Sequence, residues 1–284
     1  MIGYDFRKDF IYLRHAMGLS LHEFAEALGM SFVTLANYEN GIAFPTEEAV
    51  EALHRLAYAN KLDINLMRTH FLEDDKKGRL LLYHGSRNGI NGDINLVHGR
   101  MVNDFGLGFY MGETLNQATN WVCEYRSGSV YCFYLDTADL KGISFDVDRE
   151  WMLAICYYRG YLKGKENHPL IRAIHEKVEQ ADYIRAPIAD NLMYETLMDF
   201  ANGNLTDEQC FHALSANQLG YQVICRTQKA IDYLEPAARL YLGAGERKDA
   251  RNCRAEERQQ GIAKLRIARN QYQNEGKYID AIIA

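Results

Sequence analysis

A short charged segment, residues 73–78, separates two stretches of chain whose apolar residues follow different patterns. Before it, apolar residues recur every three or four positions, as at Phe6, Phe10 and Leu13, which is the spacing of one helix face. After it, short runs rich in β-branched and aromatic residues mix with helical stretches in no regular order. This pattern predicts an all-α domain over residues 1–72, an exposed linker over residues 73–78, and an α+β domain beyond it.

Bulk properties limit the classes of protein to which the chain can belong. Its 284 residues suit two modest domains, and a hydrophobic content of 48% is enough to bury a core in each. The formal net charge of −6 gives no general attraction to nucleic acid or to an anionic membrane. The chain opens without the basic end and apolar run of a signal peptide, and no stretch approaches the ~18 apolar residues of a membrane helix. We therefore expect a cytoplasmic protein with no membrane partner.

The spacing of cysteine and histidine argues against a metal site. Six cysteines are scattered through apolar surroundings, and no two of them form a Cys-x-x-Cys pair. The histidines show no ligand spacing either. We expect no metal cofactor, and cysteines that are reduced, buried thiols.

Helix-start signals divide the first 72 residues into short helices. Ser20 is placed to cap a helix over residues 21–28, with Glu23 at the capping-box position, and Thr46 is placed to cap residues 47–59. Further helices are expected over residues 6–16 and 32–40. The ordered elements that carry a family resemblance are Leu19-Ser20, Phe24-Ala25, Leu28-Gly29-Met30-Ser31, Tyr38-Glu39-Asn40-Gly41 and Pro45. Together they resemble the XRE/lambda-repressor-like helix-turn-helix family.

That resemblance implies DNA binding, with Ser31, Thr34 and Asn37 reading base edges if a homodimer holds them in the groove. The charges argue the other way. Acidic residues outnumber basic ones in residues 1–76, and the expected recognition helix over residues 32–40 has no lysine or arginine. Phosphate neutralisation supplies most non-specific affinity for DNA. Operator binding and a protein-contact, dimerising or regulatory role both stay open for this module.

The domain over residues 79–236 is expected to combine five strands and five helices. The strands are predicted over residues 79–84, 108–111, 129–135, 181–188 and 221–226. The helices are predicted over residues 115–125, 150–161, 170–179, 191–201 and 206–217. Trp121 is expected to pack in the core.

Two motifs in this domain suggest chemistry on a dinucleotide. His84 and Gly85 end an apolar run, and Tyr110 ends a glycine-punctuated loop that begins at Asp104. A histidine can hydrogen-bond a ribose hydroxyl, a glycine lets the backbone approach a carboxamide, and a tyrosine ring offers a stacking face. The pair resembles the first two signature elements of the diphtheria-toxin-like and PARP-like ADP-ribosyltransferases. That likeness implies NAD+ as substrate on a split antiparallel sheet.

A more specific resemblance covers residues 78–236. It rests on residues 103–110, 116–121, 189–191, 204–206 and 221–230, which are similar to DUF3990, a bacterial family grouped with the ADP-ribosyltransferases. It implies three catalytic roles: His84 as ribose anchor, Tyr110 as nicotinamide stacker and Gln222 as partner of the 2′-hydroxyl. The residues implied to bind NAD+ are His84, Gly85, Ser86, Arg87, Phe105 and Tyr110.

Gln222 departs from the wider superfamily, because PARP-like enzymes carry a glutamate at this place. A glutamate can offset the charge of an oxocarbenium-like state, whereas an amide keeps only the hydrogen bond. The difference is on the order of 1.5–3 kcal/mol. We therefore expect mono-ADP-ribosylation rather than chain elongation. Asp190 and Glu195 are candidate replacements for the missing carboxylate, although Glu195 is expected on a solvated helix face.

Residues 237–284 form a charge-rich tail that is expected to be helical, with ten basic and six acidic residues. It is suited to docking on the acidic N-terminal module or to gripping a nucleic-acid or protein target.

As a whole the chain is expected to be an ADP-ribosyltransferase fused to a regulatory helix-turn-helix, as in a toxin with a cognate antitoxin or a phage-defence protein. The alternatives are an NAD+ glycohydrolase and a non-catalytic transcriptional regulator that responds to NAD+ or ADP-ribose.

Overall fold

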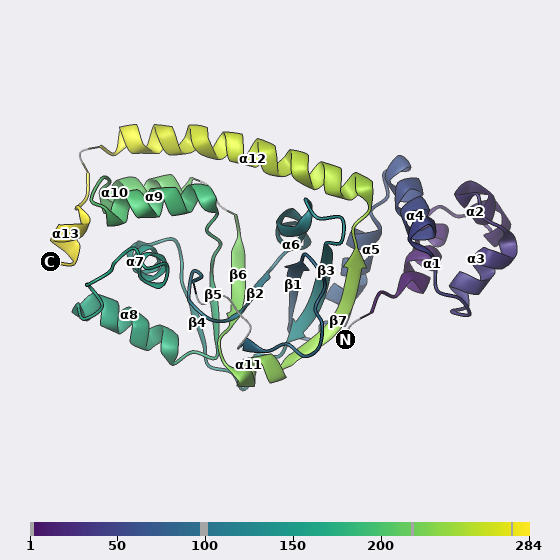
Figure 1. Ribbon diagram of the computed structural model, residues 1–284, viewed down its shortest axis with the longest axis horizontal. Helices are drawn as coiled ribbons and strands as arrows, with labels where there is room; N and C mark the ends of the chain where they lie inside the picture. Colours follow the sequence, from purple (N-terminus) through teal and green to yellow (C-terminus); the bar gives the residue numbers. More distant parts are fainter. Residues whose placement is uncertain (1–2, 97–101, 217–218, 274) are drawn as a thin grey trace. The chain divides into compact units, whose positions relative to one another are not determined.

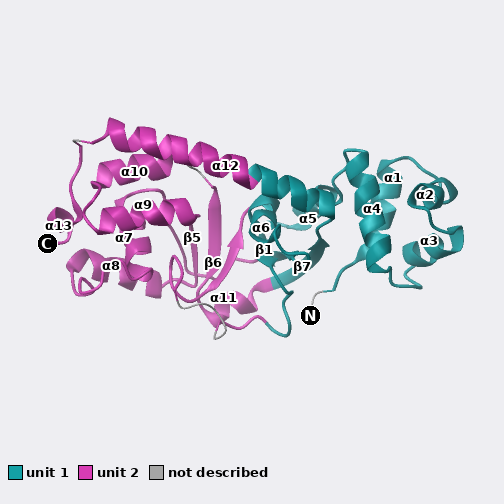
Figure 2. Ribbon diagram, turned by 45° about the horizontal axis from the view of Figure 1, so that its top comes forward, with its two compact units in different colours: residues 1–93, 114–134, 235–253 teal, residues 94–113, 135–234, 254–284 magenta. Residues whose placement is uncertain are grey.

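The computed structural model describes residues 3–96, 102–216, 219–273 and 275–284 (Figure 1). The chain forms two compact units, each built from three segments (Figure 2). The first unit comprises residues 1–93, 114–134 and 235–253, and the second comprises residues 94–113, 135–234 and 254–284. In the described parts of the chain, no helix is both long enough and apolar enough to cross a bilayer.

The N-terminal part of the first unit is helical, as predicted. Its helices are α1 (Phe6–Ala16), α2 (Leu21–Leu28), α3 (Phe32–Glu39), α4 (Glu47–Ala59) and α5 (Ile64–Asp75). Ser20 and Glu23 form the expected capping box at the start of α2, and the Thr46 hydroxyl caps α4. Gly29 ends α2 in the left-handed conformation that favours glycine. Because α5 continues through Asp75, the first three residues of the predicted linker are helical.

The rest of the first unit packs one helix and three strands around an apolar core. The elements are β1 (Leu80–Ser86), α6 (Leu115–Val122), β3 (Ser129–Leu135) and β7 (Leu234–Tyr241), with strand order β1-β3-β7. All seven residues of β3 are buried, as its unbroken apolar sequence suggests. β7 lies at a sheet edge, the position in a sheet at which a proline such as Pro236 is tolerated.

The second unit has four strands in the order β4-β5-β6-β2 and a helical layer. The strands are β2 (Phe109–Gly112), β4 (Gly142–Ser144), β5 (Tyr183–Pro187) and β6 (Tyr221–Cys225). The helices are α7 (Arg149–Tyr158), α8 (Pro169–Glu179), α9 (Asn191–Ala201), α10 (Asp207–Ser215), α11 (Gln228–Asp232) and α13 (Ile279–Ile282). The long α12 (Ala244–Gln271) begins in the first unit and ends in the second. Trp151 and Phe200 are fully buried in the core of the second unit.

Several expectations need correction. The seven-stranded sheet is mixed rather than antiparallel, since β4 and β5 pair in parallel across a connection that contains α7 and α8. The tail is not wholly helical, because residues 237–241 belong to β7. The short elements β4 and α11 were not predicted. Trp121 is 56% exposed rather than buried in the core. Asn217, the predicted end of α10, lies outside the described residues.

Candidate functional site

Gln222 occupies the second position of β6, between two other strands of the second unit. β6 pairs antiparallel with both β2 and β5, and Gln222 lies opposite Gly112 on one side and Ala186 on the other. Only 8% of its surface is exposed. A polar side chain buried at this depth needs hydrogen-bond partners from the protein.

Those partners form a buried polar network around Asp104, which is 4% exposed. Gln222 donates through Nε2 to Asp104 Oδ2 at 3.0 Å and to the carbonyl oxygen of Pro187 at 3.4 Å. Arg159 donates to Asp104 Oδ1 through Nε at 3.0 Å and Nη2 at 2.7 Å. The Tyr194 hydroxyl donates to the same oxygen at 2.8 Å. Asp104 is therefore a carboxylate withdrawn from water and held by donors from three other parts of the second unit.

Tyr110 closes the loop that carries Asp104. Its hydroxyl donates to the carbonyl oxygen of Gly106 at 2.7 Å and accepts from the amide of Phe105 at 3.2 Å. Burial raises the pKa of Tyr110 well above its ordinary value, so the phenol remains a donor at neutral pH. The hydroxyl thus fixes the loop, and the ring packs against the core of the second unit.

Arg226, directly after β6, and Gly108, within the loop itself, hold the same loop against β6. Arg226 donates through Nη1 to the carbonyl oxygens of Phe105 at 2.6 Å and Leu107 at 2.5 Å. A Cβ on Gly108 would lie 2.5 Å from a methyl carbon of Ile224, so the packing on β6 requires glycine there. Phe105 is fully buried, and its backbone N–H and carbonyl are bound by Tyr110 and Arg226, so the structure does not expose this predicted NAD+-binding residue to a ligand.

The predicted His84–Arg87 motif lies in the first unit, at the end of β1. His84 is partly buried, and Gly85 is buried against α6, where a Cβ would lie 2.6 Å from the carbonyl oxygen of Ala118. Ser86 is partly exposed. The exposed Arg87 places its guanidinium 4.6 Å from the centroid of the Tyr125 ring. Helix packing therefore already requires Gly85, whatever it contributes to a ligand.

Neither expected replacement carboxylate belongs to the Asp104 network. Glu195 is exposed on α9, as predicted. Asp190 caps α9 by accepting from the amide of Met193 at 2.9 Å. The structure thus brings Tyr110, Gln222 and Phe105 together around Asp104, whose carboxylate has no role in the sequence prediction.

The predicted base-reading residues lie on α3. Ser31 caps this helix, and its hydroxyl lies 2.8 Å from that of Thr34. Asn37 is partly buried. Arg14 forms a bidentate ion pair with Glu39: Nε donates to one carboxylate oxygen at 2.8 Å and Nη2 to the other at 2.9 Å. α3 carries no lysine or arginine, and the positive charge of the nearby Arg14 is compensated by Glu39.

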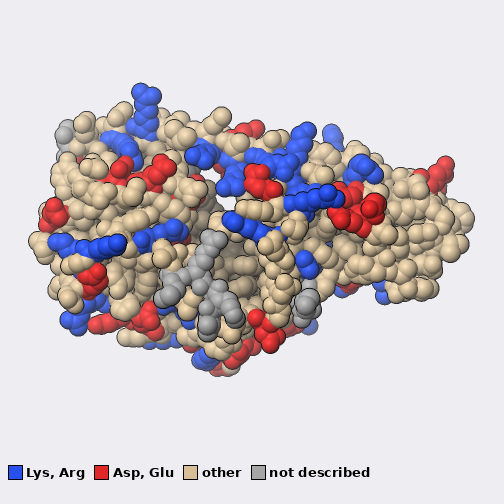
Figure 3. Space-filling model, viewed as in Figure 1, with Lys and Arg blue, Asp and Glu red and all other residues tan. Residues whose placement is uncertain are grey.

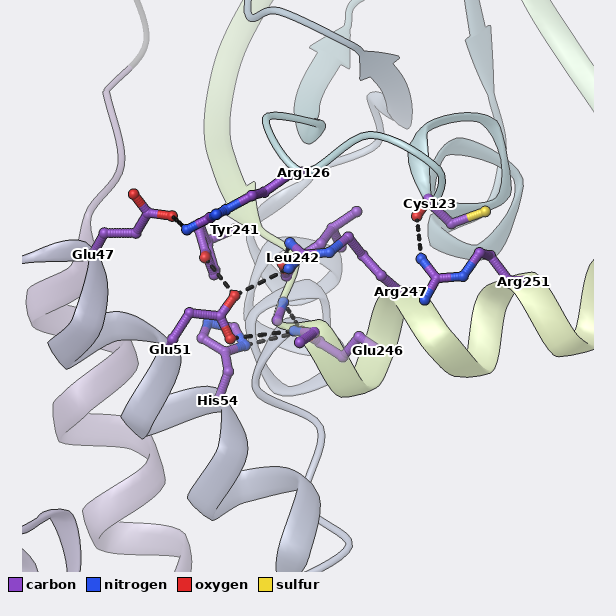
Figure 4. Close-up of polar contacts among 12 residues, drawn as sticks. Glu47, Glu51, His54, Cys123, Arg126, Tyr241, Leu242, Glu246, Arg247 and Arg251 are labelled. Carbon is purple, nitrogen blue, oxygen red and sulfur yellow. Dashed lines mark hydrogen bonds and ion pairs between the residues drawn. The ribbon is translucent and has the colours of Figure 1, made fainter.

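Within the first unit, α4 is joined to the end of β7 and the start of α12 through Glu51 (Figure 4). Its carboxylate accepts from the Tyr241 hydroxyl at 2.7 Å, from Arg247 Nη2 at 3.1 Å and from the amide of Ala244 at 3.3 Å. This cluster means that the start of the basic tail does contact the acidic N-terminal module.

A second contact at this joint involves Glu246. His54 Nδ1 lies 2.9 Å from Glu246 Oε2, and Asn65 donates to Oε1 at 2.8 Å. A Cβ on Gly243 would lie 2.6 Å from that of His54, so the backbone of the joint approaches α4 closely. We call the contacts of Glu51, His54 and Asn65 with residues 241–247 the α4–α12 joint.

Basic residues along α12 are interleaved with acidic ones (Figure 3). The helix buries Leu265 and leaves Ile262 and Ile267 exposed, at 50% and 63%. Cys253 is also exposed on α12, so the expectation that all cysteines are buried is wrong for this one. On the face that Figure 3 shows, α12 therefore presents both basic and acidic side chains rather than a continuous basic surface.

Together these features define a helix-turn-helix protein with a fused α/β part. A model described as "Helix-turn-helix domain" matches residues 12–60, a class that indicates DNA-binding regulation. A second model, "Protein of unknown function (DUF3990)", matches residues 80–235, more than half of the chain, and the chain belongs to that family. No curated protein and no solved structure is significantly similar to the chain.

Three members of the network, Asp104, Arg159 and Tyr194, were not predicted as site residues. Asp104 lies inside the 103–110 motif, so the sequence could have marked it as a site residue. The sequence could not show which residues bind its carboxylate. Arg159 follows α7 and Tyr194 lies on α9, and nothing in their local sequence marks a shared carboxylate.

Proposed function

We propose that the α/β part of the chain is an NAD+-dependent mono-ADP-ribosyltransferase. The observation that carries the proposal is the contact between Gln222 and the buried carboxylate of Asp104 at the start of β6. In this proposal the buried carboxylate polarises the amide, and the amide is the group that faces the oxocarbenium-like ribose. In this proposal the Tyr110 ring stacks on the nicotinamide, His84 holds a ribose hydroxyl, and Gln222 accepts a hydrogen bond from the 2′-hydroxyl.

The test is transfer of a biotinylated label from NAD+ to components of a host lysate. Wild type is compared with His84→Ala and with His70→Ala, which changes an exposed histidine on α5. We expect transfer by wild type and His70→Ala and loss of transfer in His84→Ala. Release of nicotinamide without transfer would identify a glycohydrolase instead. A wild-type protein that neither binds nor turns over NAD+ would contradict the proposal.

The α4–α12 joint favours a second candidate function, a regulator in which NAD+ or ADP-ribose alters DNA binding. Helix-turn-helix residues and residues of the tail share one compact unit and are hydrogen-bonded to each other, so the module is part of the first unit rather than a tethered domain. A mobility shift with DNA from the chain's own promoter, at two salt concentrations and with and without NAD+, tests this candidate. An NAD+-dependent shift without turnover would favour it over the transferase.

A further inference from the structure

The orientation of the Gln222 amide follows from the chemistry of its neighbours. Its nitrogen faces Asp104 Oδ2 and the carbonyl oxygen of Pro187, and both are acceptors. An amide oxygen cannot donate to either of them, so Nε2 must face this side and Oε1 must lie at the opposite end of the planar group. Asp104 therefore decides which end of the amide Gln222 presents.

We propose that Asp104 and Gln222 act as a split carboxylate, in which Gln222 touches the ribose of NAD+ while Asp104, whose own charge is compensated by Arg159, orients and polarises the amide. The inference rests on the proposed transferase function. Asp104 is a positioning residue in this scheme, because it acts through Gln222.

The other contacts of Asp104 hold its carboxylate in place and compensate its charge. Arg159 and Tyr194 direct three donors to Oδ1, which leaves Oδ2 for the amide of Gln222. The Arg159 guanidinium also lies 3.5 Å from the centroid of the Tyr194 ring, so the two groups that hold Oδ1 also hold each other. A hydrogen bond from Nε2 to an ionised carboxylate polarises the amide and strengthens Oε1 as an acceptor.

The same geometry explains why position 222 carries an amide. A glutamate there would bring a second carboxylate to the present contact of 3.0 Å with Asp104. Two carboxylates that share a site oppose each other's ionisation, and the one guanidinium of Arg159 can compensate only one of them. With a carboxylate already at Asp104, a neutral amide at position 222 avoids this repulsion.

The experiment measures kcat and KM for NAD+ in Asp104→Asn, Gln222→Glu and the double variant that carries both changes. We expect kcat to fall by roughly 10- to 100-fold in each single variant, with a smaller change in KM. In the double variant one charge returns to the pair, on the other partner, and we expect kcat to recover at least tenfold over either single variant. Glu113→Gln is the matched control, since Glu113 is bound by Arg185 in the same unit outside the network. It should keep wild-type kcat.

Near-ultraviolet circular dichroism checks that each variant is folded at the assay temperature. If Asp104→Asn alone does not fold, the comparison of Gln222→Glu with the double variant still decides the question. A folded Asp104→Asn variant with wild-type kcat, or a double variant no faster than Gln222→Glu, would overturn the split carboxylate and leave the transferase standing. Absence of NAD+ turnover and binding in wild type would overturn both.

Discussion

At the scale of single residues, Arg159 compensates the buried charge of Asp104. It gives two hydrogen bonds to Asp104, whose side chain is 5% exposed, and it is itself 20% exposed. Burial opposes the charge of Arg159, but the Asp104 carboxylate outweighs it, and the pKa of Arg159 is raised. Removing one partner of a buried ion pair leaves the other without compensation.

Arg159→Met is therefore expected to lower the free energy of unfolding by about 3–5 kcal/mol. Arg172→Met is the control, because Arg172 pairs with Glu176 on the exposed surface of α8, and its loss should cost under about 0.5 kcal/mol. Urea unfolding followed by tryptophan fluorescence measures both, since Trp151 is fully buried in the second unit. Equal effects of the two substitutions would show that the Asp104–Arg159 pair is not a stabilising contact.

Among the elements, β1 and α6 lie closer together than side chains on both would allow. The gap is set by Gly85, and the atom nearest to its missing Cβ is a backbone oxygen, which cannot move aside as a side chain could. The packing of Gly85 against α6 therefore fixes the end of β1. His84 is the residue directly before this contact.

Gly85→Ala should destabilise the first unit by about 1–3 kcal/mol, because its methyl group forces the strand and the helix apart. Gly3→Ala provides the comparison, since no atom lies within 4 Å of the site of its Cβ. Chemical denaturation of both variants gives the difference. A Gly85→Ala protein as stable as Gly3→Ala would mean that α6 yields without cost.

At the scale of the whole molecule, contacts between distant parts of the sequence assemble the first unit. His54 and Glu246 are 192 residues apart and lie in direct contact. Burial disfavours the charged form of His54, but the hydrogen bond to Glu246 and the negative charges of Glu246, Asp9 and Glu51 outweigh it. The pKa of His54 is raised as a result.

A raised pKa in the folded state gives a stabilisation that is complete below the unfolded value of about 6.5 and is lost as pH rises through the folded value. We expect the Tm of the first unit to decrease over that interval on going to higher pH. In His54→Gln this part of the pH dependence should disappear, whereas in His70→Gln it should persist. Thermal scans from pH 5 to about pH 9 make the comparison, and an unchanged profile in His54→Gln would refute the assignment.

Helix starts could be predicted from the sequence because they depend on neighbouring residues. Structure that depends on contacts between distant segments could not be predicted in this way. Ser20 and Thr46 marked helix starts because a cap depends on the next three residues. β7 was missed because Pro236 interrupts its pattern, and a proline is tolerated only because the strand lies at an edge. Within the site, Tyr110 and Gln222 were identified through a resemblance. The network that gives Gln222 its surroundings depends on Arg159 and Tyr194, which reach Asp104 only once the helices have packed.

The α4–α12 joint has a consequence for protease treatment. A cut between Lys76 and Arg79 would sever the covalent path from the helix-turn-helix module to β1, yet Glu51, His54 and Asn65 would still bind residues 241–247. The two fragments would then elute together from a sizing column as a nicked, non-covalent complex. Removal of the module from such a protein requires a denaturant as well as a protease.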